Sequence, residues 1–156
     1  MQNYIKSQTR LAFVQFIFQN EFFNTDFLDS IDDFQKHFYD TNISIIDEKK
    51  EFKLKFNKNF LNKLFSSLKN NIEKKNIIDD LNSFIDINRK FEKWDNILKS
   101  IIFAIIAELL ITEKNKFKIV FDDYLNISKS LVSQKETKLI NAIIQKYIDK
   151  NEINKK

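Results

Sequence analysis

The sequence predicts an all-α protein, and three observations support this fold class. The 156 residues include no glycine and no proline, so the tight turns of a multi-hairpin β fold would have to be made by Asn and Asp. Apolar residues recur at helical spacing along most of the chain. The stretch Trp94–Thr112 is apolar at every position from 101 to 111 except Glu108. Because it is too short to span lipid, we expect it to be the central helix of a soluble core.

Six further helices are expected to surround this central helix, joined by short connections and without an internal repeat. The first is rich in aromatic residues, and its wide apolar surface indicates contacts on more than one side. The expected helices cover approximately residues 7–23, 25–38, 57–72, 77–85, 94–112, 117–132 and 133–148. The central helix is the fifth of these.

Between the second and third of these helices the helical spacing is lost. Residues 40–50 are therefore expected to form a loop. The alternation of Phe52, Leu54 and Phe56 also fits a short strand, although no partner strand is evident in the sequence.

The last helix has a clear start signal. Ser133 and Glu136 have the spacing of a capping box, in which each side chain accepts a hydrogen bond from a free backbone N–H at the start of the helix.

The composition excludes most kinds of catalytic and metal chemistry. Without cysteine there is no disulfide framework and no thiolate metal site, and without glycine there is no phosphate loop or EF-hand loop. The only histidine, His37, is expected on the polar side of the second helix, and Asp122 and Asp123 on a solvated face. Glu108 is interpreted as a buried structural acid bonded to a neighbouring helix, the alternative being a catalytic or proton-switch role. We predict no enzyme, no metal and no cofactor.

The charge gives little information about partners. The net charge is +4, and of the 26 basic residues only Arg10 and Arg89 are arginines, a bias that A/T-rich codon usage would produce. A mixed solvated surface is therefore favoured over a nucleic-acid surface on charge alone. The N-terminus lacks the apolar region of a signal peptide, so we expect a cytoplasmic protein.

Four segments, in order and at the right spacing, resemble motifs of the NusB transcription antitermination family in its α-proteobacterial variety. Residues 10–19 resemble A-x-x-A-L-Q-A-L-Y-Q, and Trp94 with residues 105–110 resembles W…LR-x-x-x-Y-E-L-L. Residues 118–125 resemble I-P-x-x-V-x-I-x-E-Y-V, and residues 139–147 resemble F-V-N-G-V-L-D-x-L. The chain departs from the family pattern in its arginines. The N-terminal cluster is reduced to Lys6 and Arg10, and the mid-helix arginine is Phe103.

The resemblance implies one domain over residues 1–156, built as a seven-helix bundle of two packed sub-bundles, about 1–88 and about 89–150. It further implies binding of single-stranded boxA RNA from nascent ribosomal-RNA transcripts. This binding would occur together with the NusE-type small-subunit ribosomal protein, within an RNA polymerase antitermination complex and without a membrane.

The RNA face expected on this resemblance combines basic residues with a stacking ring. Lys6 and Arg10 would contact phosphate, Phe18 would stack on a base, and Lys135 and Lys138 would lie beside the positively polarised start of the last helix. Phe18 could equally belong to the core, and the two last lysines could simply be solvated.

Two other functions stay open. One is a helical protein–protein adaptor that has lost RNA binding. The other is a stand-alone relative of the NusB-like modules fused ahead of ribosomal-RNA cytosine methyltransferases, although the chain ends about where such a module would end.

Overall fold

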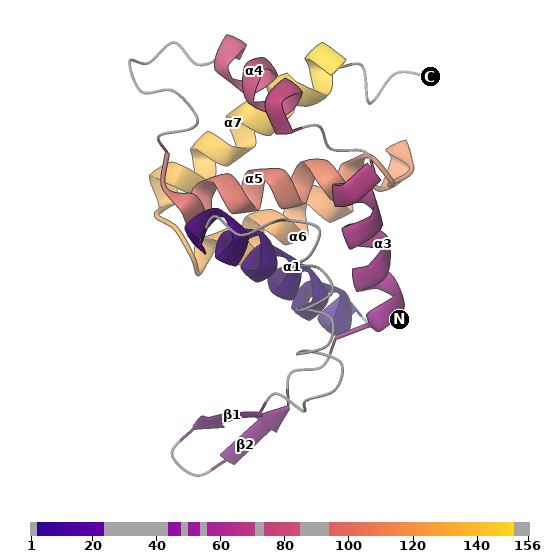
Figure 1. Ribbon diagram of the computed structural model, residues 1–156, viewed down its shortest axis with the longest axis vertical. Coiled ribbons are helices and arrows are strands. Elements are labelled where there is room, and N and C mark those ends of the chain that lie inside the picture. The colour runs from indigo at the N-terminus through magenta and orange to yellow at the C-terminus, as the bar shows by residue number, and fades with distance from the viewer. Residues whose placement is uncertain are drawn as a thin grey trace.

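The computed structural model describes residues 3–23, 44–47, 50–53, 56–70, 74–84 and 94–151. This part of the chain is mainly helical, with one small hairpin of strands β1 (Ser44–Asp47) and β2 (Lys50–Lys53) and a 3₁₀ turn, η2 (Lys114–Lys116) (Figure 1). The α-helices are α1 (Asn3–Phe23), α3 (Lys58–Asn70), α4 (Lys74–Phe84), α5 (Asn96–Leu109), α6 (Phe117–Lys129) and α7 (Gln134–Asn151).

These helices correspond to six of the seven that the periodicity predicts, with ends that differ by a few residues. The expected second helix, His37 included, lies outside the described residues. The division into two sub-bundles also stays a prediction.

Helix α5 is the centre of the molecule, as its apolar sequence predicts. Every residue from 100 to 109 is buried, and α5 contacts α1, α3, α6 and α7. The helix is shorter than the predicted 94–112, because the chain turns after Leu109. There the Ile111 N–H donates to the Glu108 carbonyl and the Thr112 N–H donates to the Leu109 carbonyl.

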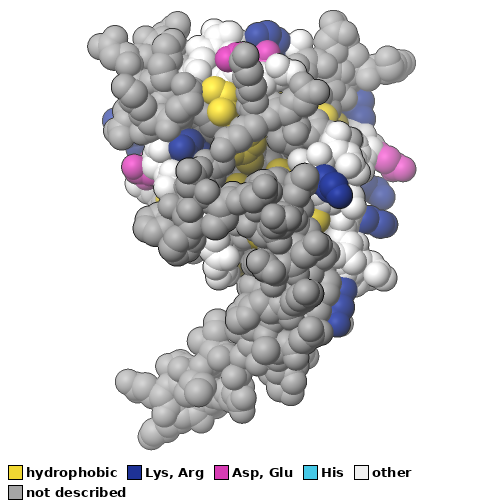
Figure 2. All heavy atoms as spheres, in the orientation of Figure 1, with side chains coloured by type: hydrophobic (Ala, Val, Ile, Leu, Met, Phe, Trp, Pro, Cys, Tyr) yellow, Lys and Arg dark blue, Asp and Glu magenta, His cyan; other side chains and the backbone are white. Residues whose placement is uncertain are grey.

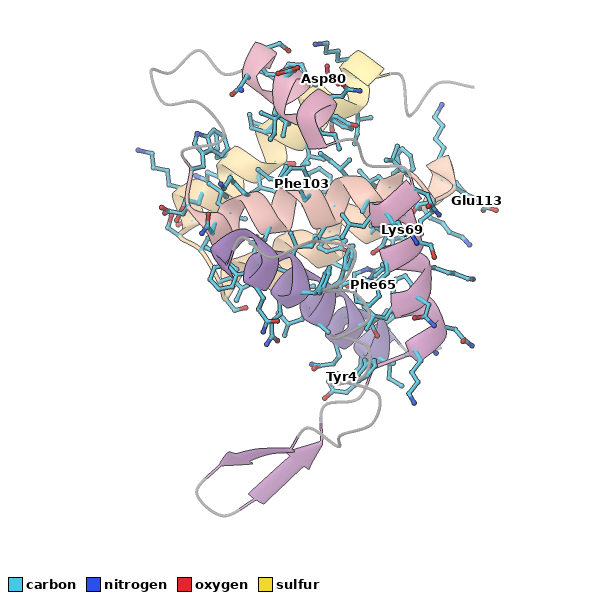
Figure 3. All side chains as sticks on the ribbon, viewed as in Figure 1. Tyr4, Phe65, Lys69, Asp80, Phe103 and Glu113 are labelled. Atoms are coloured by element: carbon cyan, nitrogen blue, oxygen red, sulfur yellow. The ribbon has the colours of Figure 1, made fainter. Side chains whose placement is uncertain are left out.

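The aromatic residues of α1 are explained by its three neighbours. Helix α1 packs against α3, α5 and α6, so a wide apolar surface is buried. Phe13 and Phe16 both meet the ring of Phe65 on α3 edge to face, with ring centroids 5.9 Å and 4.9 Å apart. Phe65 lies between α3 and the body of the molecule (Figure 3).

Helix α4 packs on α7, on the side of α5 away from α1 (Figure 1). Lys150 of α7 joins the two helices. Its ammonium lies 3.3 Å from an Asp80 carboxylate oxygen, donates to the Ser83 hydroxyl at 2.9 Å and sits 5.3 Å from the centre of the Phe84 ring. Among the described helices, none combines the length and apolar composition needed to cross a lipid bilayer.

The hairpin corrects the expectation of a loop at residues 40–50 for positions 44–47 and 50, and the other residues of that segment lie outside the described residues. Strand β1 pairs antiparallel with β2, with Ser44 opposite Lys53 and Asp47 opposite Lys50. Of the strand suspected at Phe52, Leu54 and Phe56, Phe52 lies in β2 and pairs with Ile45 of β1, Phe56 is not in a strand, and Leu54 lies outside the described residues. The pairing was missed because Ser44–Asp47 does not alternate between polar and apolar residues, and pairing between short strands is not visible in one-dimensional periodicity. The hairpin projects from the helical body (Figure 1).

Candidate functional site

A buried ion pair joins α1 to α5. The Arg10 Nε donates to both Glu108 carboxylate oxygens, at 2.9 Å and 3.1 Å, and its Nη2 donates to Oε2 at 2.7 Å. Arg10 is only 6% exposed and Glu108 only 3%. This two-pronged geometry matches the fork of a guanidinium to the two oxygens of a carboxylate.

Helix α6 completes this buried cluster. The Arg10 Nη1 donates to Asp123, and the Asp123 carboxylate also accepts from the Ser7 hydroxyl at 2.7 Å. The Tyr124 hydroxyl donates to Glu108 at 2.9 Å. We call Ser7, Arg10, Glu108, Asp123 and Tyr124 the Arg10 cluster. It ties three helices together at one point.

The contacts within the Arg10 cluster keep Arg10 and Tyr124 in the protonated states that form these hydrogen bonds. Burial alone would lower the pKa of Arg10, but the hydrogen bonds and charge of Glu108, with the bond to Asp123, outweigh it and raise the pKa above its ordinary value. Burial and the negative charge of Glu108 raise the pKa of Tyr124 well above its ordinary value. Arg10 thus stays charged and Tyr124 stays a hydrogen-bond donor. Among the described side chains, no buried polar atom lacks a partner.

This geometry corrects two expectations. Arg10 is not placed to contact phosphate, because its guanidinium is buried and its donors are directed at Glu108 and Asp123. Asp123 does not lie on a solvated face, unlike its neighbour Asp122, which is exposed. A sequence signal for the first correction existed: Arg10 precedes Phe13, Val14 and Ile17 at helical spacing, so it belongs to the apolar stripe of its helix.

Lys6 lies one turn before Arg10, at the edge of a hollow. It is half-buried and lines a cavity of about 780 Å³ together with residues of α3, of η2 and of α6. The aliphatic residues Ile111 and Ile119 line the same cavity.

The start of α7 has the predicted capping box. The Ser133 N–H donates to the Glu136 carboxylate at 3.1 Å, and the Glu136 N–H donates to the Ser133 hydroxyl at 3.1 Å. Lys135 and Lys138 are exposed in this first part of α7, and neither forms a hydrogen bond or ion pair with another described side chain. Phe18, towards the end of α1, is half-buried.

The predicted RNA residues are not gathered into one patch. Helix α1 begins at the right of the view and α7 begins at the left (Figure 1), so the two helix starts that carry the predicted basic residues lie on different sides of this view. Phe103, which stands where the family pattern has an arginine, is 4% exposed and belongs to the core. It is labelled on α5 in Figure 3.

The described side chains offer no metal site. No group of three or more His, Cys, Asp or Glu residues among them is arranged to hold a metal ion.

Comparison with known proteins identifies the family. The model of the NusB family matches residues 7–149. The transcription antitermination protein NusB of Rickettsia massiliae (strain Mtu5) is 28% identical over 141 residues, which cover 90% of this chain and 89% of the relative. The NusB protein of Rickettsia felis (strain ATCC VR-1525 / URRWXCal2) is 27% identical over 146 residues, covering 94% and 92%. No solved structure matches the chain significantly. These matches confirm the resemblance seen in the sequence motifs: the chain belongs to the NusB family.

Proposed function

We propose that this chain is a transcription antitermination factor that binds boxA RNA of nascent ribosomal-RNA transcripts together with the NusE-type ribosomal protein. The observation that carries the proposal is the family match over residues 7–149. Relatives that are named transcription antitermination protein NusB, and that this chain covers over about nine-tenths of their length, support it. The NusB family is non-enzymatic. A factor that acts on nascent transcripts would work in the cytoplasm.

The start of α7 is the best candidate for the RNA surface. Lys135 and Lys138 are exposed there, and the backbone N–H groups and dipole of a helix N-terminus add positive potential that favours phosphate. Phe18 would supply stacking for a base. Lys6 would contact phosphate further along the strand. Because the starts of α1 and α7 lie on different sides of the view in Figure 1, one RNA strand would have to extend along the molecule to reach both Lys6 and the start of α7.

A second candidate function is a protein–protein adaptor that no longer binds RNA. Two positions favour it. Arg10 is committed to the buried cluster, and Phe103 is a core residue where the family pattern has an arginine. The chain therefore has fewer groups suited to bind phosphate bidentately than the pattern provides. The methyltransferase-related alternative receives less support, because the relatives found are antitermination proteins matched over most of their length.

The experiment that tests the proposal is a binding titration with labelled boxA RNA and a scrambled RNA of the same composition, with and without the NusE-type protein. We expect a preference for boxA that strengthens when the ribosomal protein is present. Lys135→Ala and Lys138→Ala should weaken boxA binding, whereas Lys146→Ala, an exposed lysine later in α7, serves as the matched control. Equal binding of both RNAs under all conditions would favour the adaptor.

A further inference from the structure

The exposed side of α3 carries positive charge and no negative charge. Of the α-helices that the structure describes, α3 is the only one whose sequence contains no Asp or Glu. It contributes Lys58, Lys63 and Lys69, all of them exposed. The whole chain has 22 acidic residues for 26 basic ones, so this local excess of lysine departs from the average. We call the exposed side of this helix the α3 surface.

Neighbouring helices do not neutralise this charge. Lys63 and Lys69 form no hydrogen bond or ion pair with another described residue. The hollow of about 780 Å³ next to α3 is different, because carboxylates as well as lysines line it. A charge-balanced hollow does not select a charged ligand, whereas a surface with cations alone attracts polyanions. The feature that calls for a ligand is therefore the α3 surface.

Uncharged hydrogen-bonding side chains accompany these lysines. Asn62, Ser66 and Asn70 follow one another at intervals of four residues, so they share one face of the helix, and all three are exposed. Together with Lys63 they line a hollow of about 430 Å³, whose described lining contains no carboxylate. Amides and hydroxyls can both donate and accept hydrogen bonds, so this face offers polar contacts beside its charge.

This composition favours a nucleic-acid backbone over a protein segment. Protein interfaces are enriched in aromatic residues and depleted in lysine and serine, and no large apolar residue of α3 is exposed. Most hydrogen bonds from proteins to nucleic acid go to phosphate and sugar, and Lys, Asn and Ser side chains are among the usual partners. Because α3 exposes no aromatic ring on which a base could stack, such a contact would not depend on base sequence.

The α3 surface adjoins the proposed RNA surface. Lys6 of α1 and Lys63 of α3 line the same hollow of about 780 Å³. Lys and Arg side chains lie along the edge of the molecule where α3 runs (Figure 2), and Lys69 lies near the C-terminal end of this helix (Figure 3). With 13 residues, α3 spans about 20 Å. An RNA strand that contacts Lys6 can therefore continue along α3.

We propose that the α3 surface binds the sugar–phosphate backbone of the RNA next to boxA, whatever the sequence of that RNA. Lys63 and Lys69 pair with phosphates, and the Asn and Ser side chains of the same surface form hydrogen bonds with phosphate or ribose oxygens. The proposal rests on the proposed function and extends it from the boxA element to the nucleotides that flank it.

The test compares three RNAs in binding titrations with the full chain. The first is the boxA element alone, and the other two carry this element between flanks of two unrelated sequences, long enough to span α3. Each lysine contributes about 0.7 to the slope of log affinity against log salt. The advantage of the flanked RNAs over the short one should therefore grow about 25-fold when the salt concentration is lowered tenfold. We expect the same growth with both flanks.

Matched variants check where the flanks bind. Lys63→Ala and Lys69→Ala should each reduce the growth to about fivefold, and the double variant should abolish it. None of these variants should change the affinity for the short RNA. Lys146→Ala removes a lysine that is exposed outside α3 and should leave the growth unchanged. Thermal unfolding of all variants verifies that they are folded.

Three results would overturn the proposal. The flanks add no salt-dependent affinity, or the double variant keeps their full effect. The gain differs between the two flanks, which would mean that bases are read. Poly-glutamate of matched charge displaces the flanked RNA from the unmodified chain but not from the double variant, which would make the α3 surface a site for acidic protein segments.

Failure of the proposed function would be seen differently. It would appear as equal binding of the short boxA RNA and a scrambled RNA of the same length. The lysine variants test the α3 surface in either case, because they are compared on the flanked RNAs.

Discussion

Arg10 connects α1 to residues that lie 98 and 113 positions further along the chain, Glu108 and Asp123. A buried guanidinium is tolerated only where opposite charges and hydrogen bonds replace its lost hydration. Two carboxylates and the polar contacts around them do so here. At the scale of a residue, an arginine that looks like an RNA contact in the sequence is therefore a structural link between three helices.

Removing both partners of this pair should cost less than the sum of the two single losses. Arg10→Met leaves two carboxylates without their counter-charge and should lower the free energy of unfolding by about 3–5 kcal/mol. Glu108→Leu should also be strongly destabilising. The double variant should lose less than the sum of the two, by about 0.5–3 kcal/mol. Urea unfolding followed by circular dichroism measures all three.

An exposed ion pair provides the control for this cycle. Lys116 and Glu113 lie 3.9 Å apart and their side chains are 63% and 76% exposed. The same substitutions there, Lys116→Met and Glu113→Leu, should change stability by no more than about 1 kcal/mol. A loss no larger than this in Arg10→Met would show that the Arg10 cluster contributes nothing to folding.

Tyr147 should make the protein sensitive to alkaline conditions. Burial, with the negative charge of Asp80, raises the pKa of Tyr147 from 10.0 to about 12. Between these values the unfolded chain loses the phenolic proton while the folded chain keeps it, so stability falls as pH rises through this range. Tyr147→Phe should make the fall shallower, although Tyr124 still contributes to it. Urea midpoints measured at several pH values from 9 upward test this, and an unchanged alkaline loss in the variant would contradict it.

At the scale of an element, the start of α7 has two roles. Its capping box stabilises the helix, and the same turn forms part of the proposed RNA surface. The Ser133 hydroxyl accepts from the Glu136 N–H at 3.1 Å, so Ser133→Ala should lower the free energy of unfolding by about 0.5–2 kcal/mol. The same variant should bind boxA RNA more weakly, because the first turn of α7 would be less ordered. Gln134→Ala, one exposed position further on, should affect neither quantity. A loss of stability with unaltered RNA affinity would place the RNA site elsewhere.

The elements also show what a single sequence can predict. Helix α5 was predictable because an apolar run with one acid must be surrounded by other helices, and the capping box because its contacts span only three residues. The β1–β2 pairing and the Arg10–Glu108 pair were not predictable with the same methods. Both depend on contacts between separate segments, and helical or strand periodicity reports only which face of an element is apolar.

At the scale of the whole molecule, the helices bring together a core but not the predicted RNA residues. Family membership indicates the class of function, whereas the surface that performs it depends on which side chains the packing leaves exposed. Here packing removes Arg10 and Phe103 from the surface and leaves Lys6, Lys135 and Lys138 as the basic residues of the proposed RNA face.

This distribution predicts weak, mildly salt-dependent RNA binding by the protein alone. Each phosphate contact on a single strand contributes about 0.7 to the slope of log affinity against log salt, so three lysines support a slope of only about −2. Lys6→Ala, Lys135→Ala and Lys138→Ala should each flatten this slope by less than one unit.

Phe18→Ala should act differently from the lysine variants. It removes a stacking surface instead of a charge, and should lower affinity by about 1–3 kcal/mol at every salt concentration. Titrations at several salt concentrations, with and without the NusE-type protein, separate the two effects. A slope much steeper than −2 would mean that other cations hold the RNA. Linked binding sites would raise the affinity for boxA RNA when the ribosomal protein is present. If the protein binds boxA RNA no more tightly than scrambled RNA even then, the chain acts as an adaptor.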